Sequence, residues 1–132
     1  KMNDMLNEIM QVLATDSDIL SIQKTGGFKS YSRYENLSGS LTSITVIPAG
    51  PPEQTAMGSN DSLAKHFVYQ VSIEAIDRLT VKKLQNTVEN ILKTKGFFQM
   101  NGGLDEYFSD TKRYVDARFY EGNSNLYENY WK

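Results

Sequence analysis

"HFVYQVSIEAID", residues His66 to Asp77, is the clearest strand pattern in the chain and the element from which the fold can be built. One set of apolar side chains recurs at every second position, namely Phe67, Tyr69, Val71, Ile73 and Ala75. Successive side chains of a strand point to opposite faces of a sheet, and the other set here is mixed. We therefore expect this strand to bury one face in the core of the domain.

The residues after this strand predict an amphipathic helix with signals at both ends. Its buried stripe follows helical spacing and consists of Val81, Leu84, Val88, Ile91 and Leu92. Thr80 is expected to cap the start, with Leu79 and Leu84 packed across the cap as a hydrophobic staple. At the end, Gly96 is expected in the left-handed conformation that stops a helix. The contact that accompanies such a stop would join Phe97 to Leu92.

Upstream, the sequence predicts one long and one short helix and then two strands. The stripe of the first helix has helical spacing and consists of Met2, Met5, Leu6, Ile9, Val12 and Leu13. "TDSD" (Thr15–Asp18) offers N-cap residues for a short helical turn that Gly26-Gly27 would stop. Phe28–Tyr34 and Leu41–Ile47 follow as strands, the second ended by Pro48.

Downstream, two further strands are expected to pair as a closing hairpin. Phe97–Asn101 is the first, and Gly102-Gly103 is expected to end it. The second is Arg113–Tyr120, after an acidic connection. Its alternation predicts Val115, Ala117 and Phe119 facing inward, and an outward set of Tyr114, Asp116, Arg118 and Tyr120.

These elements predict a single α+β domain over residues 1–132. The expected order is α-β-β-β-α-β-β, with four to five mostly antiparallel strands in a two-layer packing against two main helices. A chain of 132 residues can bury one core of useful size without disulfides. Two segments stand apart: a flexible arm at about 49–65, between two strands, and an aromatic tail at about 123–132.

Composition excludes several classes of function. The chain has no cysteine, so disulfides, thiol catalysis and cysteine-bound metals are absent. The net charge is −2 with both signs scattered, which argues against a nucleic-acid surface. Lys29 and Arg33 among Phe28, Tyr31 and Tyr34 form the one pattern that could bind a single strand, although an amphipathic strand explains it equally well. No apolar run reaches the roughly 18 residues of a membrane helix.

A search for catalytic chemistry finds no convincing site. His66, the single histidine, has no suitably spaced partner for a triad. Asp105, Glu106 and Asp110 could hold a calcium ion or act in a small metal-dependent hydrolase, but their spacing is not that of an EF-hand. We interpret them as a solvated acidic turn. The sequence therefore predicts a protein that is not an enzyme and uses no cofactor or metal.

The order of elements is similar to that of a family of phage proteins. A polar arm, "PAGPPEQTAMGSNDSLAK" (Pro48–Lys65), precedes "VYQVSIEAID" and "TVKKLQNTVENIL", and a hairpin closes the chain. "GGLDEYFSDTKRYVDARFYEGN" (Gly102–Asn123) resembles the end of those proteins. The chain resembles the tail-terminator, or tail-completion and minor tail, proteins of siphoviruses, and most of all a tail-component family of phages or prophages of Gram-positive bacteria.

The resemblance implies a structural virion protein of the tail or neck, made in the host bacterial cytoplasm and not bound to a membrane. Such proteins form a homo-oligomeric ring, usually a hexamer, that caps the tail tube and joins tail to head. Their partners are the tail tube protein and a head-completion or neck protein, and DNA passes through the ring without sequence-specific binding. The arm would be loose in the monomer and order against neighbouring subunits.

Candidate subunit-contact residues lie on the arm and on the tail. They are Pro51, Pro52, Gln54, Met57, Asn60, Tyr127, Tyr130 and Trp131. The tail aromatics either fold onto their own sheet or dock on a neighbour. Two alternatives to a tail terminator stay open: a head-completion or neck protein, and a monomeric module that binds a protein through the arm or a sheet edge.

Overall fold

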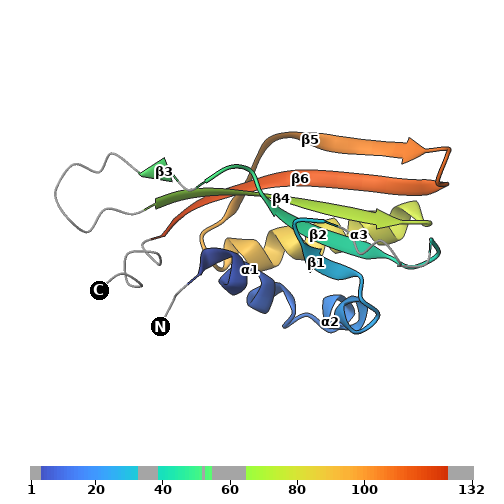
Figure 1. Cartoon of the computed structure of the whole chain (residues 1–132), viewed down its shortest axis with the longest axis horizontal. Helices are drawn as coiled ribbons and strands as arrows, with labels where there is room; N and C mark the ends of the chain where they lie inside the picture. Colours follow the sequence, from blue (N-terminus) through green and yellow to red (C-terminus); the bar gives the residue numbers. More distant parts are fainter. Residues whose placement is uncertain (1–3, 33–38, 52, 55–64, 125–132) are drawn as a thin grey trace.

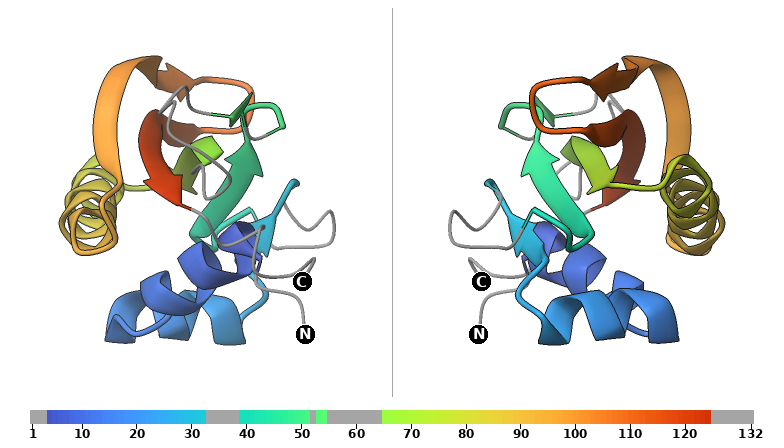
Figure 2. Two further views of the ribbon diagram at one scale, coloured as in Figure 1. Left: turned by 90° about the vertical axis from the view of Figure 1, so that its left-hand side faces the viewer. Right: turned by 90° about the vertical axis from the view of Figure 1, so that its right-hand side faces the viewer.

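The computed structural model describes residues 4–32, 39–51, 53–54 and 65–124. The elements, in chain order, are α1 (Met5–Leu13), α2 (Ser17–Lys24), β1 (Phe28–Ser30), β2 (Ser43–Pro48), β3 (Glu53–Gln54), β4 (Lys65–Ala75), α3 (Arg78–Lys93), β5 (Phe98–Phe108) and β6 (Arg113–Ser124). The strands form one sheet in the order β1-β2-β4-β6-β5. The two-residue strand β3 is outside this order and pairs with the start of β4. The three helices lie on one side of the curved sheet (Figures 1 and 2). The expected α+β fold is confirmed.

β4 is the central strand, and its predicted alternation is confirmed. It pairs antiparallel with β2 along one edge and with β6 along the other. Every second side chain of β4 is buried under the helices, namely Phe67, Tyr69, Val71, Ile73 and Ala75. Ile44 and Val46 of β2 pair directly with Ile73 and Val71. The pairs join the apolar faces of two strands into one continuous surface.

β1 is shorter than predicted. It runs parallel to β2 and stops at Ser30, because Tyr31 adopts a positive φ of 70° that breaks the extended conformation. Phe28 is 4% exposed, so its ring belongs to the core and offers no stacking surface to a nucleic acid. Arg33 and Tyr34, the rest of the predicted binding pattern, lie outside the described residues.

The helix starts are set by aspartates. The side chains of Asp4 and Asp16 accept hydrogen bonds from the first backbone amides of α1 and α2. α3 begins earlier than predicted, because Asp77 is its cap and accepts hydrogen bonds from Thr80 N at 2.9 Å and Thr80 Oγ1 at 2.8 Å. These bonds hold the pKa of Asp77 below its ordinary value. The predicted cap at Thr80 and staple at Leu79 are therefore wrong, and Leu79 is 60% exposed.

The predicted end of α3 is confirmed. Gly96 has a φ of 79° and donates its N–H to Lys93 O, while Phe97 N donates to Leu92 O at 2.9 Å. This pair of bonds is the Schellman arrangement. Leu92 and Phe97 are both buried, as the predicted hydrophobic contact requires.

β5 continues through the glycine pair that was expected to end it. Its register with β6 shifts between Met100 and Leu104, where Gly102 and Gly103 adopt φ values of 103° and 121°. The glycines therefore form a β-bulge inside one strand. A Cβ on Gly103 would lie 2.2 Å from Ala117 O, so this position also requires close approach of two backbones.

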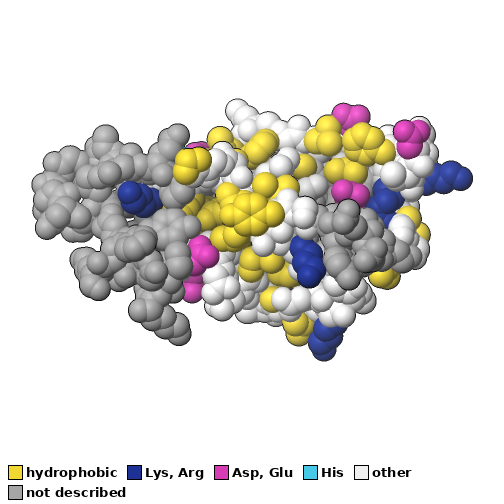
Figure 3. Space-filling view, in the orientation of Figure 1, with side chains coloured by type: hydrophobic (Ala, Val, Ile, Leu, Met, Phe, Trp, Pro, Cys, Tyr) yellow, Lys and Arg dark blue, Asp and Glu magenta, His cyan; other side chains and the backbone are white. Residues whose placement is uncertain are grey.

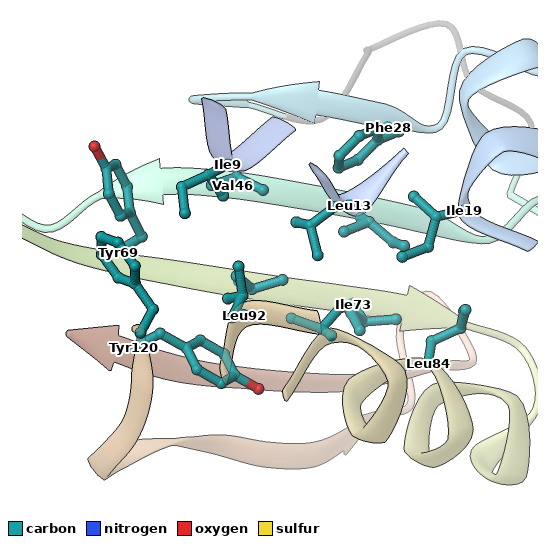
Figure 4. Close-up of a cluster of buried hydrophobic side chains, with 14 of the residues drawn as sticks. Ile9, Leu13, Ile19, Phe28, Val46, Tyr69, Ile73, Leu84, Leu92 and Tyr120 are labelled. Carbon is teal, nitrogen blue, oxygen red and sulfur yellow. The ribbon is translucent and has the colours of Figure 1, made fainter. Parts of the chain in front are cut away.

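β6 buries residues that were predicted to face outward. Asp116 and Tyr120 are both fully buried, because α3 covers the face that they share with Val71 and Tyr69 of β4. Figure 4 shows how Tyr120 lies beside Leu92 under the sheet. The predicted outward position is therefore wrong for Asp116 and Tyr120, while Val115 and Ala117, predicted to face inward, are also buried, on the other face of the sheet.

We expect Gly103→Ala to destabilise the protein by about 2–4 kcal/mol, because backbone strain adds to a clash with Ala117 O. Gly50→Ala is a matched control: Gly50 has the same φ of 121°, but its Cβ would meet nothing within 4 Å. Urea unfolding of both variants measures the difference. Equal losses of stability would show that the close approach to β6 contributes nothing.

Candidate functional site

The base of the arm, at the end of β2 and at β3, is held by contacts within the chain itself. After β2, Ala49 N donates to Val68 O at 2.8 Å, and Gly50 turns the chain with a φ of 121°. β3 then pairs with β4, with Gln54 opposite Lys65 and Glu53 opposite His66. The prediction of an irregular arm over residues 49–65 is therefore wrong for residues 53–54 and Lys65, which are paired as strands. The part between the paired strands is residues 55–64, which lie outside the described residues.

The structure places only two of the predicted contact residues. Pro51 lines a cavity at the base of the arm, and Gln54 lies in β3. The others fall outside the described residues, namely Pro52, Met57, Asn60, Tyr127, Tyr130 and Trp131. Their assignment to a subunit interface stays a prediction.

The cavity at the arm base has a volume of about 340 Å³. It lies between the start of α1, the residue after β1, the end of β2 and the start of β4. Its lining is mainly apolar and aromatic, with one acidic residue: Leu6, Tyr31, Pro48, Gly50, Pro51, Phe67, Val68, Tyr69 and Asp4. Phe67 and Tyr69 stack with ring centroids 6.1 Å apart and planes at 9°. The volume falls in the range of small-ligand or side-chain sites.

His66 lies next to this base, within the sheet. It is flanked by β3 on one side and by β6 on the other, so it lies inside the sheet. Its Nδ1 lies 2.9 Å from Asn123 Oδ1, and its Nε2 lies 3.2 Å from Glu121 Oε1. Both partners belong to β6, so the imidazole ties the end of β6 to the start of β4.

A second polar cluster joins α3 to β5 and β6. Asp116, which is 0% exposed, accepts a bond from Lys82 Nζ at 2.7 Å and bonds from Arg118 Nε at 2.8 Å and Arg118 Nη2 at 3.0 Å. Gln85 Nε2 donates to Asp116 O at 3.0 Å, and Tyr120 Oη donates to Gln85 Oε1 at 2.7 Å. The buried carboxylate is thus paired and hydrogen-bonded, as burial of a charge requires.

Asp105 belongs to this cluster, which changes the interpretation of the acidic residues. It lies in β5 and pairs with Lys82 Nζ at 2.5 Å, while Glu106 is its neighbour along the strand and faces the other side. The predicted acidic turn is therefore wrong for these two residues. Within the described part of the chain, no group of three or more His, Asp or Glu side chains is placed to hold a metal ion.

The pKa shifts follow from these contacts. The hydrogen bond from Lys82 is the main cause that holds the pKa of Asp105 below its ordinary value. Burial lowers the pKa of Lys82, but the hydrogen bonds and charges of Asp105 and Asp116 outweigh it, so the pKa is raised. Burial also raises the pKa of the Tyr120 hydroxyl. The charged forms of Lys82 and Asp105 are thus stabilised by fixed partners, whereas burial favours the neutral hydroxyl of Tyr120.

Arg113 anchors a connection on the opposite face of the sheet. Its side chain is 3% exposed and donates to Leu41 O at 2.8 Å and Glu74 O at 3.0 Å, as well as to Gly39 O. The segment before β2 is thereby attached to the far end of β4. The sequence pattern placed this arginine in a strand but offered no signal for its partners.

Comparisons with known proteins show a shared fold. No protein-family model matches the chain, and no curated protein matches it. The chain is similar in structure to a chain of the virion of a native gene transfer agent (GTA) particle, with a TM-score of 0.53 and 8% identity. The match covers 88% of this chain and 90% of that chain. In the described residues, no helix is long and apolar enough to cross a membrane.

We expect Asp116→Asn to lower the free energy of unfolding by about 2–3 kcal/mol, because two cations lose their buried partner. Asp105→Asn removes another partner of Lys82. Because the Asp105 side chain is 63% exposed, this change should lower the free energy of unfolding by less than about 1 kcal/mol. Urea unfolding at neutral pH compares the two. Equal effects would contradict a network centred on Asp116.

The contribution of Asp105 should depend on pH with a defined sign. Its pKa is lowered in the folded state, so its stabilising effect is complete above the ordinary aspartate pKa of about 3.9 and is lost as the pH falls through the lowered value. The stability gap between the wild type and Asp105→Asn should therefore be constant from pH 5 to 8 and should close below about pH 4. A gap that widens on acidification would contradict the pairing with Lys82.

Proposed function

We propose that the chain is a structural, non-enzymatic virion protein that forms a ring on a phage-like tail, as a tail terminator or tail-completion component. The observation that carries the proposal is the fold similarity to a chain of a gene transfer agent virion, because it extends over 88% of one chain and 90% of the other. The similarity to siphovirus tail terminators in the order of elements supports the finer assignment. In this proposal the ring caps the tail tube and joins it to the head.

The surface of the sheet supports assembly. β5 is an outer strand of 11 residues, and one of its backbone edges is paired with no other strand among the described residues. Two aromatic rings of β5, Phe98 and Phe108, are 54% and 41% exposed on the face turned away from the helices. Figure 3 shows hydrophobic side chains gathered over the middle of this view and near the right-hand ends of β5 and β6. Exposed apolar patches and open edges of this kind are typical of protein contacts.

The far end of the molecule offers more apolar surface. Ile76, Leu79 and Tyr107 are 57%, 60% and 49% exposed around the start of α3 and the end of β5. Tyr107 packs on Tyr114 with ring centroids 4.7 Å apart, which fixes its orientation. The arm base and this patch lie at opposite ends of β4 (Figure 1). Two different surfaces at opposite ends suit the head-to-tail contacts of a closed ring.

A replacement of the arm tests its role in the ring. Gln54 and Lys65 are register partners, so an Asn-Gly turn can replace residues 55–64 and close a two-residue hairpin. We expect this variant to keep the fold and to remain monomeric, while the wild type forms a closed oligomer as concentration rises or when tail tubes of the encoding phage are added. Light scattering and electron microscopy measure the assembly.

A matched control keeps the length of the arm. Replacing residues 55–64 by ten Gly and Ser residues retains the spacing but removes Met57 and Leu63, and it should also abolish assembly if these side chains contact a neighbour. Circular dichroism checks that both variants are folded. A wild-type protein that stays monomeric and binds no tail tube would overturn the proposal and favour a monomeric binding module.

A further inference from the structure

β5 differs from the other long strands because none of its 11 side chains is buried. Every second side chain of β4 is buried, whereas β5 lies at the margin of the sheet and is exposed on both faces (Figure 2). Proteins usually protect the open edge of such a strand with lysine, proline or a β-bulge. Between Phe98 and Phe108 there is no lysine, arginine or proline, so the bulge is the one protective feature of this edge.

The bulge divides β5 into two parts, and the second part offers the longer regular edge. Five consecutive residues, Leu104 to Phe108, keep an unbroken register with β6, against three before the bulge. Asp105 pairs with Asp116, which is buried on the face that the helices cover. Leu104, Glu106 and Phe108 therefore alternate onto the opposite face. That face presents an apolar, an acidic and an apolar side chain in a row.

The charges on this part of β5 are negative. Glu106 is exposed and has no ion pair in the described part of the chain, while Asp105 pairs with Lys82. Arg113 is nearby in β6, but it is 3% exposed and its donors are already used, and Lys112 lies in the turn after β5. A strand added at this edge would place a side chain directly opposite Glu106. Opposite charges in such cross-strand pairs are favourable and like charges are unfavourable.

A second copy of this chain does not meet that requirement. Pairing Leu104–Phe108 with itself would bring together the Asp105 and Glu106 carboxylates of both copies, which is destabilising. The short strands β1 and β3 have three and two residues, so neither supplies a strand of matching length. The edge therefore fits a segment of another protein better than a second copy.

We propose that the open edge of Leu104–Phe108 accepts an extended segment of a different protein as an added strand. The segment carries a lysine or arginine opposite Glu106 and an apolar side chain two residues away on either side, against Leu104 and Phe108. Backbone hydrogen bonds give such a contact its affinity, and the alternate side chains give it specificity. The inference does not rest on the ring proposal, because it concerns a partner other than a second copy.

A short peptide with this pattern tests the proposal. Acetyl-Ser-Val-Thr-Arg-Thr-Val-Ser-amide has the same sequence in both directions, so it can add as a parallel or an antiparallel strand. We expect it to bind and to slow the hydrogen exchange of backbone amides within Leu104–Phe108. NMR measures this on protein at a concentration where light scattering shows a monomer. The same peptide with Glu in place of Arg should bind about tenfold more weakly.

Variants of the protein provide matched controls. Glu106→Lys should weaken binding of the Arg peptide by about tenfold and strengthen binding of the Glu peptide. Asp18→Lys makes the same change of charge on an exposed residue of α2 and should leave both affinities within about twofold. Phe108→Ala should weaken binding, whereas Phe98→Ala, which removes an exposed ring of the same strand before the bulge, should not.

Two results would overturn the proposal. The first is equal binding of the two peptides, or binding without protection of Leu104–Phe108, because neither shows an added strand. The second is protection of these amides that rises with protein concentration in the absence of peptide, which would assign the edge to a second copy. Because peptide binding is scored on the monomer, its failure leaves the ring proposal standing, and failure of the ring leaves the peptide result standing.

Discussion

The fold depends on burying one face of β4 while its backbone is paired along both edges. Val71 and Ile73 are 0% exposed on the helix-facing side, and β2 and β6 supply the hydrogen-bond partners on either side. A buried strand whose N–H and C=O groups were unpaired would be strongly unfavourable. Since α3 follows β4 after a short turn, it packs beneath the same strands. α1 then completes the layer against α3 and β2 (Figure 2).

The face of the sheet that the helices cover is not uniformly apolar, and its polar residues constrain the position of α3 on the sheet. Asp116 is buried there, and its charge is tolerated because Lys82, Gln85 and Arg118 direct donors at it. Buried pairs of this kind contribute little net stability compared with apolar packing, but a missing partner is costly. A shift of α3 along β6 would break several of these bonds at once. The network therefore specifies the position of the helix more than it stabilises the domain.

The elements with a clear periodicity could be predicted from the sequence. Where two local signals compete, the sequence did not show which one determines the structure. β4 and the end of α3 follow from alternation and from Gly96. The start of α3 was misplaced because Asp77 and Thr80 are both good caps, and only the fold selects the aspartate. Gly102-Gly103 is equally typical of a strand end and of a bulge. In β6 both faces carry aromatic and charged residues and both contribute buried side chains, so alternation alone could not show that Tyr120 is buried.

The candidate site was still harder to predict, for a physical reason. The cavity at the arm base combines Leu6, Pro48 and Val68, which are dozens of residues apart and carry no motif. Catalysis requires particular chemical groups at particular distances, so the residue types that it needs can be sought in a sequence even when they lie far apart. An assembly surface requires area, shape and a few anchors, which many sequences can supply. The exposed rings of β5 are consistent with the second kind of site, which becomes visible only when distant segments meet.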